Sequence, residues 1–476
     1  MSRTHEPARL PDVAQYYQWS WRFPHRGACP RRTLAAVSSA LPTADAEGIA
    51  RVIEAARPVA ELLAAEGHRS YVVGGLVRDL LLGVPTSSAD VDMTTDALPG
   101  DVKRIVAPIA DDLWAVGERF GTIGCRVDGV EFEITTHRAE RYEPGSRKPV
   151  VEFSTAIDAD LSRRDFTVNA MAISLPDGEV VDPFDGAGDL RERRLRTPDD
   201  PVRSFDDDPL RVLRAARFRA AHDLEPVPEL VAGAQEVVAR LEIVSAERKR
   251  VELDKLLATA RPSIGLRLLD DIGVWPWVLP HLEWLELEQV GAAVDAVSTD
   301  AAVVVADHVV PTDATVLVRR SVLLGGLGGS RRVDADTVDE AMQSLRHSKA
   351  DRQRTRRVVE CVHRVVEHGV GAPSVRRVVA ALRADTPVLG MALDVVDTAL
   401  AAEWATALAA LAEVEPLDHF GPGLDGREIM QLLGVDTGRA VGDANELLVA
   451  IRLDEGVLPL EELRDRLRSW WATRDV

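Results

Sequence analysis

The sequence predicts an α+β fold, with strands and helices mixed in an N-terminal domain and helices alone after it. Between residues 45 and 182, strand-like runs flank two hairpin dipeptides, Asp128-Gly129 and Asp177-Gly178. After residue 200, apolar residues recur at helical spacing. No further hairpin signal, a turn dipeptide between two strand-like runs, occurs there. The 476 residues are enough for about three domains, so several helical units are expected behind the first domain.

Each element of the N-terminal domain has a local signal. Residues 1–45 contain scattered proline, arginine and aromatic residues, so we expect an irregular leader. Helical periodicity, β-branched runs and a capping glycine predict this series: a helix over 47–66, a strand over 71–73, a helix over 76–82 that ends at Gly83, a strand over 91–95, and strand pairs around both hairpin dipeptides.

The chain is expected to divide into five segments. They are an irregular leader (1–45), a mixed head (46–182), a helical neck (183–280), a helical body (281–420) and a helical tail (421–476). No internal repeat and no low-complexity tract interrupts this series.

The composition excludes several classes of protein. With 57 Lys+Arg against 77 Asp+Glu, the formal net charge is −20, which excludes a simple polybasic nucleic-acid binder but leaves room for a local basic face. No apolar run is long enough for a membrane helix, and the start lacks the apolar core of a secretory signal. Cys29, Cys125 and Cys361 show neither metal-type nor disulfide-type spacing. We therefore expect a cytoplasmic protein with reduced thiols and no membrane partner.

The first chemical signal is a pair of aspartates. Asp90 and Asp92 are two residues apart on a predicted strand, so both carboxylates project from one face. They repel each other unless a cation lies between them, and Mg²⁺ prefers such oxygen ligands. Upstream, Gly74-Gly75 lies between a strand and a helix, where backbone N–H groups can approach a phosphate chain, and Arg78 follows one turn later. This order favours a nucleoside triphosphate site with Mg²⁺ over the competing interpretation, a solvated turn.

The run from Gly74 to Asp92 resembles the head signature GGxVRDxLLG…DxD of class II tRNA CCA-adding enzymes and bacterial poly(A) polymerases. Both belong to the nucleotidyltransferase superfamily related to DNA polymerase β. The resemblance implies a polymerase-β-like head with a small mixed or antiparallel sheet, followed by an all-α neck, body and tail. It also implies that Asp90 and Asp92 are the catalytic metal ligands, and that Gly74, Gly75 and Arg78 contact the nucleotide.

A second signature, RRDFTVNAM, occupies residues 163–171. On the residues alone, a salt bridge between Arg164 and Asp165 is the simpler interpretation. In the family this motif addresses the ribose 2′-hydroxyl, which is both a donor and an acceptor. The resemblance therefore implies nucleotide contacts from Arg164, Asp165 and Asn169. On an earlier strand-like run, Glu133 is the candidate third carboxylate, with Glu131 as the alternative.

A third signature, DDPLRVLRAARF, places arginines every three residues on one predicted helix. No acidic residue occurs over 209–222, which suits an anionic partner, although a solvated helix face is the alternative. An aspartate can accept a hydrogen bond from the amino group of C or A, and an arginine can donate to a ring acceptor. The resemblance assigns selection of CTP and ATP to Asp208 and Arg211, and contacts with nucleotide phosphate or base to Arg214 and Arg217.

A fourth match supports the third. Residues 247–257, ERKRVELDKLL, resemble the family helix that supports the base-reading residues. We expect Ser245 to cap this helix and Glu247, Arg248 and Glu252 to organise the structure rather than the chemistry.

The middle of the chain departs from the family. Many bacterial members carry a His-Asp phosphohydrolase motif that resembles LLHDIGKP, and Gly325 and Gly326 stand here where His and Asp would be. Glycine has no side chain that could ligate a metal. We therefore expect a degenerate HD-like region without phosphodiesterase or phosphatase activity.

The leading hypothesis is a template-independent tRNA nucleotidyltransferase that adds CCA from CTP and ATP by two-metal phosphoryl transfer. The helical half would grip the tRNA acceptor arm by shape and backbone charge. Two alternatives stay open: a poly(A) polymerase or partial (CC- or A-only) adding enzyme, and a catalytically retired RNA-binding paralogue. The oligomeric state also stays open.

Overall fold

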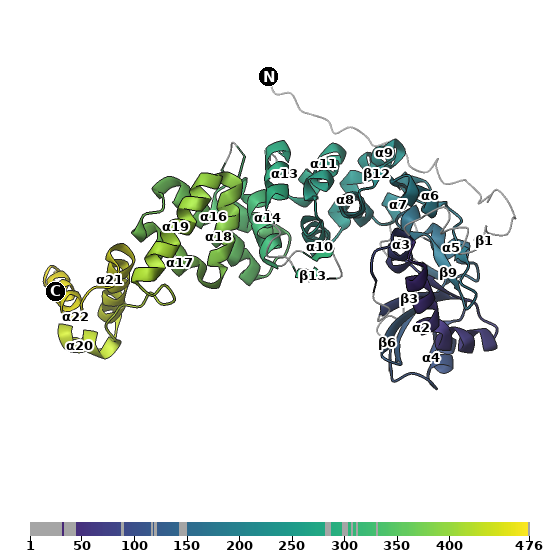
Figure 1. The fold of residues 1–476 in the computed structure, drawn as a ribbon, viewed down its shortest axis with the longest axis horizontal. Coiled ribbons are helices and arrows are strands. Elements are labelled where there is room, and N and C mark those ends of the chain that lie inside the picture. The colour runs from purple at the N-terminus through teal and green to yellow at the C-terminus, as the bar shows by residue number, and fades with distance from the viewer. Residues whose placement is uncertain are drawn as a thin grey trace, which may run out of the picture.

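The computed structural model describes residues 31–32, 44–86, 90–115, 118, 121–141, 150–280, 287–297, 303–305, 308–310, 313–329 and 332–474. Figure 1 shows an elongated molecule, with a head that contains the sheet at one end and a long arm of helices that leads to the C-terminus at the other. The head and the last helices extend from the same side of this arm (Figure 1). The expected fold class, an α+β head followed by helical units, is confirmed.

The head is built on one mixed sheet of eight strands. In spatial order they are β1 (Arg31–Arg32), β10 (Val180–Val181), β9 (Ala172–Leu175), β2 (Ser70–Val73), β3 (Asp90–Thr95), β6 (Val130–Thr136), β5 (Thr122–Val127) and β4 (Asp112–Trp114). Strands β3 and β6 run parallel, and the other neighbours run antiparallel. The expectation of an irregular leader is wrong at β1, because these two residues pair with β10; residues 1–30 and 33–43 lie outside the described part.

Both predicted hairpin dipeptides turn the chain between paired strands. Asp128 and Gly129 have φ values of 50° and 79°, and they join β5 to β6. Two positive φ values match the right-handed twist of the flanking strands, which is why Asp-Gly suits this turn. Asp177-Gly178 joins β9 to β10, with Gly178 at φ 75°. A separate ladder of β7 (Arg138–Arg141) and β8 (Val150–Phe153) follows β6.

Helices cover one face of the head sheet, and a smaller apolar cluster covers the β2, β9 and β10 part of the other face. The helical elements of the head are α2 (Ala46–Ala65), α3 (Gly75–Leu82), α4 (Pro99–Val106), α5 (Ile157–Ser162), the 3₁₀ turn η3 (Thr167–Asn169) and α6 (Gly186–Arg191). On β3, the side chains of Val91 and Met93 are buried in the core that α2 and α4 close, whereas Asp90 and Asp92 alternate with them and are exposed. On β3 and β6, the opposite face of the sheet is therefore left for polar chemistry.

The helical arm follows the head. It contains α7 (Pro201–Asp207), α8 (Leu210–His222), α9 (Pro228–Val237), η4 (Val238–Ile243), α10 (Ala246–Leu257), α11 (Pro262–Ile272), α12 (Trp275–Val278), α13 (Leu287–Ala296), α14 (Asp313–Gly325), α15 (Ala335–Ser344), α16 (Lys349–His368), α17 (Ala372–Leu382), η5 (Arg383–Asp385), α18 (Thr386–Val396) and α19 (Thr398–Val414). One continuous apolar core joins these helices to the head. No helix in the described ranges is both long and apolar enough to cross a membrane.

Two short ladders interrupt the helical region, which the sequence predicted as helices alone. Strand β11 (Arg194–Leu195) pairs in parallel with β12 (Glu225–Pro226), and β13 (Val303–Val305) pairs antiparallel with β14 (His308–Val310). These strands have two or three residues each, too few for a periodic pattern, and their pairing depends on how the helices around them pack.

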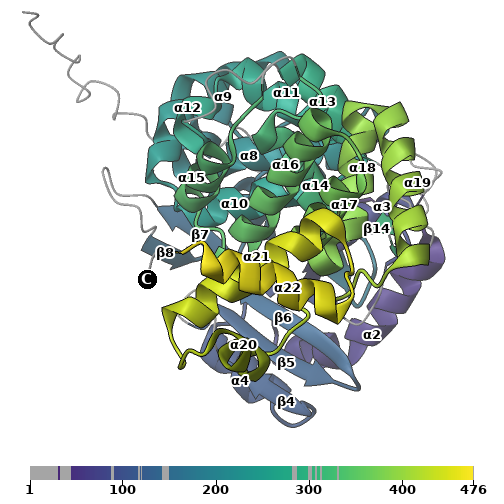
Figure 2. The same ribbon diagram turned by 90° about the vertical axis from the view of Figure 1, so that its left-hand side faces the viewer.

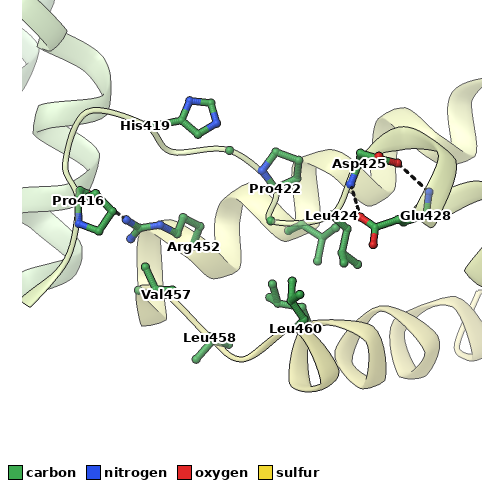
Figure 3. A pocket seen from close by; sticks show the side chains of 15 residues that line it. Pro416, His419, Pro422, Leu424, Asp425, Glu428, Arg452, Val457, Leu458 and Leu460 are labelled. Atoms are coloured by element: carbon green, nitrogen blue, oxygen red, sulfur yellow. Dashed lines mark hydrogen bonds between the residues drawn. The ribbon is translucent and has the colours of Figure 1, made fainter.

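The tail comprises α20 (Gly426–Leu433), α21 (Arg439–Glu455) and α22 (Leu460–Ala472), which share a small apolar core of their own. Figure 2 shows α21 and α22 in front of the body helices when the molecule is viewed from the tail end. Where the tail meets α17, Glu415 accepts hydrogen bonds from Arg376 Nε at 2.5 Å and from Arg452 Nη1 at 2.6 Å. All three side chains are buried. Figure 3 shows Arg452 directed at Pro416 beside a pocket between this junction and the tail.

Candidate active site

The register of the sheet gathers carboxylates on its open face. In the parallel pair, Asp90 lies beside Glu131 and Asp92 lies beside Glu133. Because paired residues project to the same side and alternate residues share a face, all four side chains belong to the face that α2 and α4 leave uncovered. The predicted pair Asp90 and Asp92 is therefore found on one face, with Glu133 next to Asp92.

The electrostatics of this face favour a cation. Burial raises the pKa of Asp92, and the charges of Glu133 and Asp90 raise it further, while Arg164 acts in the opposite direction. Asp92 is thus a carboxylate whose negative charge is poorly compensated by the protein, and a divalent cation would compensate it. Among the described residues, no three His, Cys, Asp or Glu side chains already form a metal cluster. Mg²⁺ in proteins is often held by one or two carboxylates, with oxygens of the substrate as further ligands. The pair Asp90 and Asp92 fits this kind of coordination.

The structure separates the two candidates for a third carboxylate. Glu131 Oε1 accepts a 2.6 Å hydrogen bond from Arg126, which also pairs with Asp112. Glu133 has no such partner among the described residues, and it is exposed. Glu133 is therefore better placed to act with Asp92, and its role as a ligand stays a prediction.

Gly74 and Gly75 lie against the carboxylates. Gly74, with φ 83°, precedes α3, and a Cβ added to it would lie 3.6 Å from Asp92 Oδ2 and 3.4 Å from Arg164 Nη1. Because Gly74 has no side chain, its backbone comes close to both groups, in a conformation that L side chains rarely adopt. The N-terminus of α3 thus opens next to Asp92, where a phosphate chain would meet unpaired N–H groups.

Arg78 is buried, and its guanidinium is held by its neighbours. Its Nη1 donates to Asn169 Oδ1 at 2.7 Å, it pairs with Asp79 at 2.8 Å, and it lies 5.2 Å from the centre of the Phe218 ring. Asn169 in turn donates through Nδ2 to Asp165 at 2.9 Å. The structure therefore brings Arg78, Asn169 and Asp165 together in one network.

Arg164 and Asp165 do not pair with each other, so the salt bridge that their adjacency suggested is absent. Arg164 lies 3.4 Å from Asp160, which is 1% exposed. Asp165 is bound by Arg214 of α8, 49 residues away, and Nε of Arg214 donates at 2.9 Å. Burial acts to raise the pKa of Asp165, but the charge of Arg214 and hydrogen bonds from Asn169 and Arg214 lower it overall. Each residue of the predicted pair thus belongs to a different part of the site.

The predicted base-reading residues lie at the junction of α7 and α8. Asp208 Oδ2 accepts from Arg248 at 2.8 Å. Arg211 donates to Ser204 Oγ at 2.7 Å and to the Arg163 carbonyl oxygen at 2.6 Å. Asp208 and Arg211 therefore lie close together, but each side chain is hydrogen-bonded to a different residue and not to the other.

Arg214 and Arg217 share a carboxylate that the sequence assigned only to structure. Arg217 Nε donates to Glu252 Oε2 at 2.7 Å, and Arg214 Nη1 lies 3.6 Å from Glu252 Oε1. The guanidinium of Arg217 lies 4.7 Å from the centre of the Phe218 ring, and that of Arg214 lies 5.7 Å from it. Ser245 caps α10, as predicted. The network therefore runs from Arg78 in the head to Glu252 in the neck.

Sequence reasoning missed two residues of this network. Phe218 receives three guanidinium groups on its ring, yet in the sequence it is one apolar residue of a helix. Asp160 accepts from Arg163 at 2.7 Å and lies beside Arg164, and no motif marks it in the sequence. A signal was available for Phe218, since an aromatic residue among closely spaced arginines predicts cation–π contacts.

Comparisons with known proteins agree with the motifs. Residues 70–196 match the family model described as the poly(A) polymerase head domain, and residues 223–285 match the model described as "Probable RNA and SrmB- binding site of polymerase A". A CCA-adding enzyme of Levilactobacillus brevis is 38% identical over 232 residues, which cover 48% of this chain and 57% of that enzyme. One from Bacillus pumilus is 38% identical over 201 residues, covering 42% and 48%. The chain thus spans about half the length of the curated relatives it matches.

Solved structures show the same fold along most of the chain. A Bacillus stearothermophilus CCA-adding enzyme in complex with CTP has a TM-score of 0.69 at 23% identity, over 89% of this chain and 98% of that one. A Thermotoga maritima CCA-adding enzyme complexed with tRNA has a TM-score of 0.62 at 21% identity, over 92% and 99%. The family resemblance expected from the motifs is therefore confirmed for the head and the neck, and the fold is confirmed along the helical arm.

Proposed function

We propose that this chain is a template-independent tRNA nucleotidyltransferase that adds CCA to the tRNA 3′ end from CTP and ATP and releases pyrophosphate. The observation that carries the proposal is the pair Asp90 and Asp92 on one sheet face, with Asp92 beside Gly74 and next to a network that leads from Arg78 to Arg214. The names of the curated relatives, and the CTP and tRNA bound to two proteins of similar fold, support this substrate class.

The donor set on β3 fits a divalent metal. The raised pKa of Asp92 reports repulsion from Glu133 and Asp90 as well as burial, and a bound cation would relieve that repulsion. We assign Mg²⁺ to Asp90 and Asp92, with Glu133 as the third carboxylate. When bound, two such ions lower the pKa of the attacking 3′-hydroxyl and stabilise charge on the leaving pyrophosphate.

The remaining residues bind and orient the substrates. The proposal gives the triphosphate to Gly74, Gly75 and Arg78, the ribose to Arg164, Asp165 and Asn169, and the base to Asp208 and Arg211, with positive charge from Arg214 and Arg217. Asp208 must exchange its bond with Arg248 for the amino group of C or A, and Arg211 must exchange Ser204 for a ring acceptor. The helical arm and tail would take the rest of the tRNA by shape.

The proposal includes a cytoplasmic location. Cys125 and Cys361 are free and buried, and burial raises the pKa of the Cys125 thiol to about 11 and that of Cys361 to about 12. Both thiols are therefore inert and protonated at neutral pH, which suits a reducing compartment.

The test is incorporation of radiolabelled CTP and ATP by the purified chain with Mg²⁺, on a tRNA that lacks its 3′ CCA. We expect three additions in the order C, C, A. Addition of C alone, of A alone after CC, or of long A tracts on any RNA would replace the proposal by the partial-adding or poly(A) alternatives. No incorporation by the wild type would favour the retired paralogue.

Asp90→Ala distinguishes catalysis from RNA binding in the same assay. We expect this variant to lose incorporation and to keep its affinity for tRNA, because the metal ligand is lost while the arm is unchanged. Asp112→Ala is the matched control, since Asp112 lies in the same cross-strand row at the far edge of the sheet.

A further inference from the structure

A row of four paired residues crosses the open face of the head sheet. It consists of Asp92 on β3, Glu133 on β6, Gly124 on β5 and Trp114 on β4, each beside the next. Because neighbours in such a row project to the same side, the indole of Trp114 lies on the face that carries the carboxylates.

Gly124 makes room for the indole. A Cβ added to Gly124 would lie 2.0 Å from Trp114 Nε1 and 2.1 Å from its Cε2, so no larger residue fits there without moving the ring. The indole therefore lies directly over the Gly124 backbone. Trp114 is only half-buried, and no aromatic or cationic side chain of the described residues stacks on the ring. One ring face is thus packed on the sheet, and the side chain keeps part of its surface exposed.

The two sides of the carboxylates differ in character. On the β2 side, Gly74 and Arg164 lie beside Asp92, and the network continues to Arg214 in the neck. That side is rich in positive charge and suits a triphosphate. The other side is formed by β6, β5 and β4, which lie side by side in Figure 2. Along the row it presents Glu133 and then Trp114. A phosphoryl transfer needs an attacking group opposite the leaving pyrophosphate, and this second side is the one left for it.

We propose that Trp114, packed on Gly124, is the platform on which the base of the RNA 3′-terminal nucleotide stacks. Gly124 is two strand positions from Asp92, about 10 Å at the usual strand spacing. A nucleotide whose 3′-hydroxyl is at the carboxylates can place its base at about that distance. Stacking on an aromatic ring accepts any base, which suits an enzyme whose RNA end changes after each addition. The inference rests on the proposed function and makes Trp114 a positioning residue for the primer.

The test combines fluorescence and kinetics. A tRNA with 2-aminopurine at its 3′ terminus is bound to the wild type without nucleoside triphosphates, and we expect its fluorescence to be quenched. The same label placed five nucleotides upstream should not be quenched. Trp114→Leu should abolish the quenching and raise the KM for tRNA about tenfold, with the KM for CTP and ATP unchanged. Trp114→Phe, which keeps a ring, should retain most of both properties.

Leu113→Ala is the matched control, because Leu113 is the preceding residue of β4, is 38% exposed and points to the opposite face. It should leave both properties unchanged. The proposal is overturned if the terminal label is not quenched by the wild type, or if Trp114→Leu raises the KM for triphosphate instead of the KM for tRNA. The quenching needs no chemistry and only the wild type, so it stays decisive if Trp114→Leu does not fold. A wild type that quenches the label but incorporates nothing would contradict the proposed function alone.

Discussion

Among single residues, Asp92 has the environment that defines the site. It lies beside Gly74 and Glu133, and partial burial together with the charges of Glu133 and Asp90 raises its pKa. A carboxylate in this position costs free energy when it is charged and unpaired, and the cost disappears when a cation binds. The residue is thus held ready for a metal by charges that lie on two strands.

Glu133 should control the pH at which this site binds metal. Since the raised pKa of Asp92 means that protons compete with the metal, binding is lost as pH falls through that pKa. Glu133→Gln removes one proposed ligand, so we expect weaker metal binding at high pH. It also removes a neighbouring charge and lowers the pKa of Asp92, so the acid limb, normalised to the high-pH plateau, should shift to lower pH. The measurement is Mn²⁺ binding by the metal-free chain as a function of pH. Glu131→Gln is the control, because Arg126 already neutralises Glu131, and an equal shift in both variants would contradict the argument.

At the scale of elements, helix α8 joins the head to the neck. Its Arg214 binds Asp165 of the head, its Arg217 binds Glu252 of α10, and its Phe218 packs against both arginines. The junction before it holds Asp208 and Arg211. The sequence left two interpretations of these arginines, a solvated helix face and a site for an anion. In the structure they connect the head to the neck. A nucleotide site at the N-terminal end of α8 is our proposal.

Asp208→Ala should relax base selection. The variant loses the acceptor for the amino group of C or A, so incorporation of GTP and UTP should rise relative to CTP and ATP, by about tenfold or more for one lost base contact. Competition between labelled triphosphates on tRNA that lacks CCA measures the ratio. Arg248→Ala breaks the same ion pair from its other side and should leave selection intact. If both variants select as the wild type does, the base-reading role of Asp208 is wrong.

Helix α14 ends at Gly325, where the family motif would have a metal ligand. A Cβ added to Gly325 would lie 2.9 Å from Val359 Cγ2, so a larger side chain there requires Val359 of α16 to shift. We expect no metal-dependent 2′,3′-cyclic phosphodiesterase activity from purified Asp90→Ala, assayed with Mn²⁺, Ni²⁺ or Mg²⁺. Hydrolysis that depends on one of these metals would show that another cluster replaces the lost pair.

Across the whole molecule, the tail is attached to the body by a buried ion-pair cluster. Glu415 bridges Arg376 of α17 and Arg452 of α21, and these arginines also donate to the carbonyl oxygens of Asp454 and Pro416. The tail has its own apolar core, and this polar cluster joins it to the body together with the ion pair of Arg377 and Asp454 at 2.8 Å. Its geometry determines where the tail lies relative to the head, at the other end of the arm (Figure 1).

Glu415→Gln should loosen this attachment. It leaves two buried guanidinium groups without a countercharge, so we expect a loss of about 3 kcal/mol in the free energy of unfolding. Urea denaturation measures this loss, and limited proteolysis should cut first between body and tail. Glu461→Gln, in an exposed pair with Arg464, is the control and should leave the free energy of unfolding almost unchanged. Equal losses would mean that the cluster does not fix the tail. The KM for tRNA should rise in Glu415→Gln while the KM for CTP stays the same.

Much of this molecule follows from short-range patterns in the chain. Asp128-Gly129 predicts a hairpin because both residues tolerate the positive φ of a tight turn that matches the twist of the flanking strands. Alternation on β3 places Asp90 and Asp92 on one face, and the glycine pair and Gly83 bound α3, all from local chemistry. The ladder of β13 and β14 was missed, because strands of three residues have no period to detect.

The partners of the polar side chains, in contrast, come from packing. Although Arg164 and Asp165 are adjacent in the sequence, they do not bind each other. Arg164 pairs with Asp160 and Asp165 pairs with Arg214, since each charged group binds the partner that folding brings within reach. The choice of Glu133 over Glu131 and the position of Trp114 over Gly124 depend on cross-strand register in the same way. Residue types and local spacing thus specify the elements and the kind of chemistry. Contacts between residues far apart in the chain specify which charge meets which, because only the folded backbone brings them together.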